Sequence, residues 1–178
     1  MRTAPTPSRE ETRANATFEA LIWSMSRPGR LRDLPERGEA QIIEALIDRE
    51  CHVFCADPLL MPKVLETGAR IAALAGADHV FLGALTDLDG LKSLSTGSDL
   101  YPDGGASVVI RARLGEGPRL RLTGPGIETE ECVHIGGVPD GFWSLRRDLI
   151  QYPIGFDVFF IDGAQVLGLP RSTKVEML

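Results

Sequence analysis

Helical and extended apolar patterns alternate along the first half of the sequence. The first helical pattern places apolar side chains on one face, at Phe18, Leu21, Ile22 and Met25, and the pair Pro28-Gly29 ends it. Two more helical patterns, over 42–47 and 59–74, alternate with apolar runs typical of buried strands, over 51–55 and 79–85. This alternation predicts an α/β fold in which helices flank a mixed, partly parallel sheet.

Strand signals dominate the second half of the sequence. After a long loop, alternating apolar positions over 106–114 and 118–122 surround a glycine-rich turn, which predicts a β-hairpin. A strand is expected over 128–135, a helix over 139–150, and a strand pair over 156–161 and 165–169. No repeat or linker interrupts the 178 residues, so we predict one domain over 1–178 with a disordered lead over 1–9.

The charge balance limits the expected partners. The 19 Lys and Arg residues face 25 Asp and Glu residues, a net charge of -6, whereas duplex binding needs an excess of positive charge. Nucleic acid is therefore not an expected partner. Segment 1–11 lacks the apolar core of a secretory signal, and no apolar run is long enough to span a bilayer. We predict a cytoplasmic protein that does not associate with a membrane.

Four arginines fall on one face of the predicted hairpin. In that register Arg113 lies opposite Arg119, and Arg111 lies opposite Arg121. Like charges directly opposite one another destabilise a strand pair by up to about 1 kcal/mol. The face therefore either binds a phosphate-rich ligand or an acidic protein surface through its guanidinium groups, or is simply exposed to water.

The spacing of the cysteine, histidine and lysine residues gives little support for a metal site or a cofactor. Cys51 and Cys55 would lie on one strand face and His52 on the other, which disfavours a zinc site. A pyridoxal cofactor needs a lysine for its Schiff base, and no lysine has a context that favours this role. We predict neither a metal nor a cofactor.

Five sequence blocks occur in a fixed order along most of the chain. They are 25–29 (MSRPG), 94–97 (LSTG), 121–127 (RLTGPGI), 152–157 (YPIGFD) and 169–176 (LPRSTKVE). Together they resemble the PhnH family, a subunit of the bacterial carbon-phosphorus lyase core complex. The resemblance implies a fold like that of the pyridoxal-dependent (PLP) transferases without the cofactor. It also implies a homodimer that assembles with the PhnG, PhnI and PhnJ subunits.

The resemblance further implies a role in organic phosphonate catabolism. Family members support the step in which an alkylphosphonate displaces adenine from ATP, which gives ribose 1-methylphosphonate 5-triphosphate when the substrate is methylphosphonate. Catalysis of this transfer is placed on PhnI, so the implied role is an essential accessory subunit without activity of its own. A free-standing enzyme acting on a phosphonate or a nucleotide is the alternative.

Matching the family blocks residue by residue gives a candidate site for a phosphonate or nucleotide phosphate. Its side chains and backbone N–H groups suit phosphate oxygens. The members are Ser95, Thr96, Gly97, Arg121, Thr123, Gly124 and Arg171. Of the hairpin arginines only Arg121 belongs to the family pattern. For the other three arginines, this favours simple exposure to water over a shared ligand site. A purely structural role for the same blocks, in turns and subunit contacts, is an alternative with as much support as the phosphate site.

Overall fold

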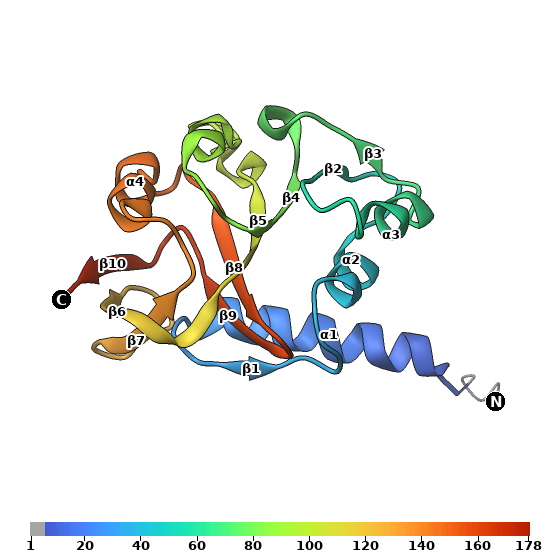
Figure 1. Ribbon diagram of the computed structural model, residues 1–178, viewed down its shortest axis with the longest axis horizontal. Helices are drawn as coiled ribbons and strands as arrows, with labels where there is room; N and C mark the ends of the chain where they lie inside the picture. The colour runs from blue at the N-terminus through green and yellow to red at the C-terminus, as the bar shows by residue number, and fades with distance from the viewer. Residues whose placement is uncertain (1–5) are drawn as a thin grey trace.

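The structure, a computed structural model, describes residues 6–178. In this part of the chain seven strands form the main sheet (Figure 1), in the spatial order β1 (Arg32–Asp33), β9 (Gln165–Leu169), β8 (Asp157–Asp162), β5 (Ser107–Arg111), β4 (His79–Ala84), β2 (His52–Cys55) and β3 (Arg70–Ile71). Five neighbouring strands of this sheet run parallel: β3, β2, β4, β5 and β8. Strand β9 is antiparallel to both β8 and β1. The predicted α/β class, with a mixed and partly parallel sheet, is confirmed.

Two sets of elements cover the two faces of this sheet. One face carries α1 (Arg9–Ser26), α2 (Ala40–Leu46) and α3 (Met61–Glu66). The other carries α4 (Phe142–Leu149), three short 3-10 turns (Leu74–Gly76, Asp89–Ser93 and Pro102–Gly104) and a small antiparallel sheet. The order of that sheet is β10 (Lys174–Met177), β6 (Arg113–Thr123) and β7 (Glu131–Gly136).

The central strands are buried on both faces. In β5 the side chains of Val108 and Ile110 enter the core beneath the small sheet, whereas Val109 enters the core beneath the helices. In β8, Phe159 and Phe160 divide between the two cores in the same way. Successive side chains of a strand point to opposite faces, so a strand covered on both sides appears in the sequence as a continuous apolar run.

Helix α1 begins inside the range predicted as a disordered lead. Residues 1–5 of that range lie outside the described residues, whereas Ser8 caps the helix and Arg9 is its first residue. The Ser8 hydroxyl accepts the Glu11 N–H at 3.1 Å, and the Glu11 carboxylate accepts the Ser8 N–H at 2.6 Å. This reciprocal capping box satisfies two N–H groups that a helix start leaves unpaired.

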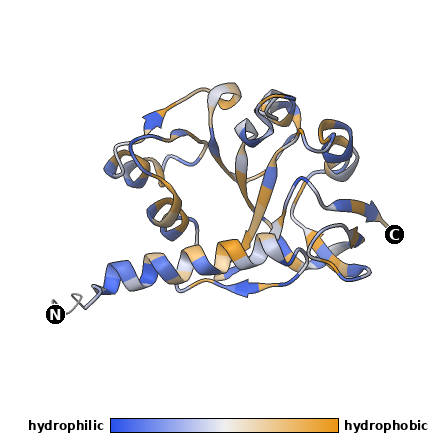
Figure 2. Ribbon diagram, turned by 180° about the vertical axis from the view of Figure 1, so that it is seen from behind, coloured by the Kyte–Doolittle hydropathy of each residue, from blue (hydrophilic) through white to orange (hydrophobic). Residues whose placement is uncertain are grey.

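The buried face of α1 differs from the predicted one. Leu21 is buried, but Phe18 and Ile22 are 45% and 51% exposed, and the helix packs through small side chains such as Ser24. The reason is a close approach to β9, because a Cβ added at Gly168 would lie 2.7 Å from the Ser24 carbonyl carbon. Figure 2 shows the hydrophobic second half of α1 lying along the sheet.

The predicted hairpin over 106–122 is wrong. Strand β5 lies between the parallel strands β4 and β8 of the main sheet, and β6 pairs with β7 and β10 in the small sheet. Strand β5 is apolar on both faces, so its favourable place is inside the main sheet. The predicted turn is a bulge within β6, where the register against β7 shifts between Leu114 and Arg119.

The helix predicted over 59–74 is only six residues long. It ends at Glu66, and Gly68 adopts a φ of +76° two residues later, in the left-handed region that stops helices. The chain then forms β3 at the edge of the main sheet.

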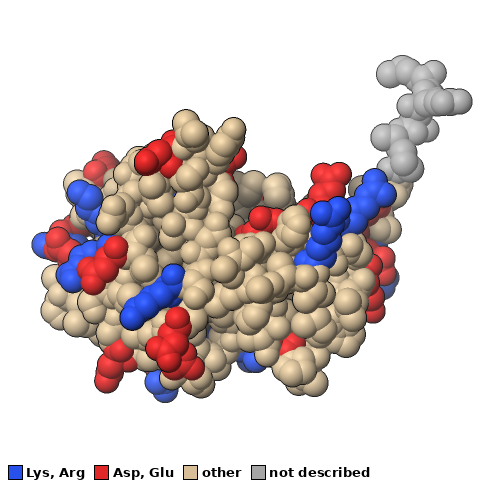
Figure 3. Space-filling view, turned by 90° about the horizontal axis from the view of Figure 1, so that it is seen from above, with Lys and Arg blue, Asp and Glu red and all other residues tan. Residues whose placement is uncertain are grey.

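Within 6–178 no helix is both long and apolar enough to cross a membrane. On the face in Figure 3, acidic and basic side chains are intermixed, so this face carries no extended positive area.

Candidate functional site

The predicted turn Ser95-Thr96-Gly97 is folded onto residues 102–105. The Ser95 hydroxyl donates to the Gly104 carbonyl oxygen at 2.7 Å, and Thr96 pairs with Gly105 in an isolated bridge. Gly97 has a φ of +78°, and an added Cβ would lie 2.8 Å from the carbonyl oxygen of Pro102. The turn therefore requires glycine at this position.

Arg171 connects the loop that packs on this turn to the start of β8 through hydrogen bonds. Its guanidinium binds the Asp157 carboxylate, with Nε at 3.2 Å and Nη2 at 2.7 Å, and also donates to the carbonyl oxygens of Pro102 and Gly105. The Arg171 side chain is 13% exposed. The structure thus brings Ser95, Thr96, Gly97 and Arg171 together, with most of the Arg171 N–H groups bonded inside the protein.

The remaining predicted residues lie on the small sheet. Arg121 stands opposite Glu176 of β10, with Nε 3.1 Å from the carboxylate, and this hydrogen bond raises the pKa of Arg121. Thr123 stands opposite Lys174, and a Cβ added at Gly124 would lie 2.8 Å from the Ser172 carbonyl oxygen. The predicted set is therefore divided in two, and segment 169–176 joins the halves. A role of the seven predicted residues in ligand binding stays a prediction.

Of the other three arginines, only Arg111 leaves the face that carries Arg121. Arg111 lies in the main sheet, where it pairs with Glu39 at 2.6 Å and with Asp57 at 2.5 Å. Arg113 and Arg119 lie on β6 with Arg121, opposite every second residue of β7, and so share its exposed face. The predicted shared face is wrong for Arg111 because it depended on the hairpin. The acidic partners of Arg111 come from the residue before α2 and from the β2–α3 connection.

A cavity of about 320 Å³ lies between α4 and segment 171–176. Its lining contains a single carboxylate, Glu176, against four cationic side chains: Arg146, Arg147, Arg171 and Lys174. Of these, only Arg171 belongs to the predicted site. The other three were not predicted from the sequence, although the neighbouring Arg146 and Arg147 within a predicted helix are a visible signal.

Arg146 is the most unusual of these cations because it is only 3% exposed. Its Nη1 and Nη2 donate to the carbonyl oxygens of Thr173 and Pro170, at 3.2 and 3.0 Å. No carboxylate of the described residues lies within 4 Å of it. Burial lowers the pKa of Arg146 to about 10, although the charge of Asp157 acts in the opposite direction. A buried guanidinium without a carboxylate in contact costs free energy that an anion can recover.

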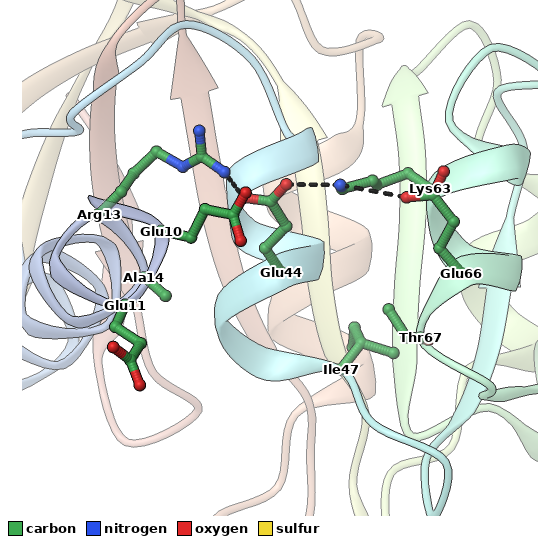
Figure 4. A pocket seen from close by; sticks show the side chains of 9 residues that line it. All are labelled: Glu10, Glu11, Arg13, Ala14, Glu44, Ile47, Lys63, Glu66 and Thr67. Atoms are coloured by element: carbon green, nitrogen blue, oxygen red, sulfur yellow. Dashed lines mark hydrogen bonds and ion pairs between the residues drawn. The ribbon is translucent and has the colours of Figure 1, made fainter. Parts of the chain in front are cut away.

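A second cavity, of about 490 Å³, lies among the three helices on the opposite face of the sheet. Figure 4 shows Glu44 of α2 between Arg13 and Lys63, at 2.6 and 2.5 Å. The hydrogen bond from Lys63 holds the pKa of Glu44 below its ordinary value. Here the cations are paired with carboxylates of neighbouring helices, so the geometry supports helix packing rather than ligand binding.

Comparison with known proteins gives a consistent result. A sequence model of the family described as "Bacterial phosphonate metabolism protein (PhnH)" matches residues 7–176. The chain is 34% identical over 173 residues to the putative C-P lyase subunit protein HtxG of Stutzerimonas stutzeri, covering 93% of this chain and 87% of that protein. It is 27% identical over 182 residues to the alpha-D-ribose 1-methylphosphonate 5-triphosphate synthase subunit PhnH of Rhizobium meliloti (strain 1021), covering 92% and 90%. The chain therefore belongs to the PhnH family of bacterial phosphonate metabolism proteins.

Proposed function

We propose that this chain is an accessory subunit of a carbon-phosphorus lyase complex in phosphonate catabolism. The observation that carries the proposal is the family match over 7–176. Two relatives aligned over most of their length support it, one named as a C-P lyase subunit and the other as a synthase subunit. In this role the chain supports the formation of ribose 1-methylphosphonate 5-triphosphate from ATP and methylphosphonate.

The finer assignments follow from the family resemblance. We propose one domain that folds like the PLP-dependent transferases, assembles as a homodimer in the cytoplasm and joins PhnG, PhnI and PhnJ. The mixed sheet flanked by helices is compatible with that fold. We assign it no catalytic residue, because the Arg171, Ser95 and Arg121 side chains are bonded to protein groups.

The activity of the isolated chain distinguishes an accessory subunit from a free-standing enzyme. Purified protein is incubated with ATP and methylphosphonate, alone and then with PhnG, PhnI and PhnJ, and the release of adenine is measured. We expect no adenine from the isolated chain, none from the three partners without it, and turnover when all are combined. Turnover by the isolated chain establishes the enzyme alternative.

The exposed apolar face of α1 is our candidate for the homodimer contact. Phe18, Ile22 and Trp23 are 45%, 51% and 41% exposed on neighbouring positions of this helix. Large apolar side chains left exposed on one helix are candidates for burial in a subunit contact, and homodimer interfaces are more apolar than transient ones. We therefore place a second copy of the chain on this face.

Ile22→Glu is expected to convert the dimer to a monomer, because it introduces a charge into the apolar contact. Light scattering during size-exclusion chromatography measures the mass of the particle. Leu59→Glu is the matched control, since Leu59 is 88% exposed at the turn before α3 and is not part of the proposed contact, and this variant should stay dimeric. A dimeric Ile22→Glu protein contradicts this interface.

A further inference from the structure

Three buried polar atoms without a hydrogen-bond partner belong to residues that line one cavity. They are Trp143 Nε1, Arg146 Nε and Thr173 Oγ1. Their residues are 8%, 3% and 2% exposed. Within 6–178 five such atoms occur in total, and three of them belong to residues that line the cavity between α4 and segment 171–176. Buried polar groups are rarely left unpaired, and each one that is needs an explanation.

The chemistry of these atoms defines what would pair with them. An indole N–H and a guanidinium Nε–H can only donate, and a threonine hydroxyl can donate as well. A group that satisfies all three therefore presents several acceptor oxygens. A phosphate or phosphonate group carries three terminal oxygens on one centre, which matches the three unpaired donors among the residues that line this cavity.

The charges around the cavity favour an anion. The Arg171 charge is balanced by Asp157, and the Glu176 carboxylate is engaged by Arg121. Arg146 and Lys174 have no carboxylate within 4 Å among the residues that the structure describes. An oxyanion would neutralise both cations through charge-assisted hydrogen bonds.

The size and walls of the cavity indicate a small organic ligand rather than a bare ion. Its volume of about 320 Å³ falls at the lower end of the range of small-molecule sites. Ile150, Tyr152 and Val175 provide apolar lining beside the donors. Such a lining suits the organic part of the ligand.

We propose that this cavity binds the phosphate or phosphonate group of a small organic molecule, with Trp143, Arg146 and Thr173 as hydrogen-bond donors and Lys174 as a counter-charge. The oxyanion site stands on the cavity alone. Its assignment to an alkylphosphonate or to ATP rests on the proposed function.

Binding is measured on the isolated full chain by the fluorescence of Trp143. The sequence contains two tryptophans, so a Trp23→Phe background leaves Trp143 as the sole reporter. Methylphosphonate, ATP and acetate are titrated separately at low ionic strength. We expect a saturable signal with methylphosphonate or ATP, which identifies the source of the oxyanion, and weaker binding of acetate.

Two substitutions locate the bound group. Thr173→Val removes one donor to a charged ligand and should raise Kd about tenfold or more. Lys174→Ala should raise Kd severalfold, whereas Lys92→Ala, a matched change at a lysine that does not line the cavity, should leave it unchanged. Binding that neither Thr173→Val nor Lys174→Ala weakens overturns the proposal, as does the absence of any signal at millimolar ligand.

The stability of the ligand-free variants gives an independent readout. Thr173→Val removes a hydroxyl that has no partner, so Tm should rise by about 2 to 4 °C. Thr17 is equally buried, but its hydroxyl donates to the Arg13 carbonyl oxygen at 3.0 Å, so Thr17→Val should lower Tm. A fall in Tm for both variants contradicts an unpaired Thr173 hydroxyl and with it the site.

These results are separate from the test of the proposed function. A chain that binds no oxyanion but still supports adenine release with its partners overturns the cavity site alone. A chain that binds methylphosphonate or ATP but is dispensable for adenine release overturns the accessory role alone.

Discussion

Arg171→Ala is expected to lower the free energy of unfolding by about 3 kcal/mol, because it leaves a partly buried carboxylate without its counter-charge. The Arg171 and Asp157 side chains are only 13% and 24% exposed. The same substitution removes the hydrogen bonds to the Pro102 and Gly105 carbonyl oxygens, which hold the loop over 95–105 against β8. Urea unfolding followed by circular dichroism measures the loss.

Arg121→Ala is the matched control for this prediction. Arg121 also pairs with a carboxylate, that of Glu176, but the two side chains are 41% and 62% exposed. Exposed ion pairs contribute little to stability because water screens them. We expect a much smaller decrease for Arg121→Ala than for Arg171→Ala. Equal effects would contradict the stabilising role of the Arg171–Asp157 pair.

Gly105→Ala is expected to destabilise the protein by about 2 to 3 kcal/mol through overpacking. Gly105 has an ordinary φ of -74°, so the backbone conformation itself tolerates alanine. The new Cβ would overlap the Gly155 carbonyl oxygen and lie 2.5 Å from Arg171 Nη1. The carbonyl oxygen is backbone and cannot move aside without displacing the chain before β8. Thermal and urea unfolding both report the effect.

Gly76→Ala separates this steric effect from the general cost of adding a methyl group. An added Cβ at Gly76 meets no heavy atom within 4 Å. Substitutions at such open positions usually change stability by less than about 0.5 kcal/mol. If Gly105→Ala were as mild as Gly76→Ala, the close packing of the 95–105 loop on residue 155 would be refuted.

The main sheet could be predicted because its strands carry a strong local signal. The predicted strands over 51–55 and 79–85 are continuous apolar runs, which is typical of strands covered on both sides. The same local pattern does not identify which strand pairs with which. The hairpin prediction joined β5 to β6 because they are neighbours in sequence, whereas their hydrogen bonds go to different sheets.

The candidate site could be predicted only in part for a related reason. The sequence blocks located Arg171 and the Ser95-Thr96-Gly97 turn, which the structure brings together. The acidic partner of Arg171 lies in another block, and nothing in the spacing pairs them. Arg146 was missed because its importance comes from burial without a carboxylate in contact, a property that exists only in the folded protein.

The central claim is that this chain works as a subunit of a larger assembly, and co-purification tests it most directly. The tagged chain is co-expressed with PhnG, PhnI and PhnJ, and the mass of the purified particle is measured by native mass spectrometry. We predict a stable complex that contains the chain in fixed stoichiometry with the other subunits. A tagged chain recovered free, beside a complex of the other three that lacks it, would contradict the account.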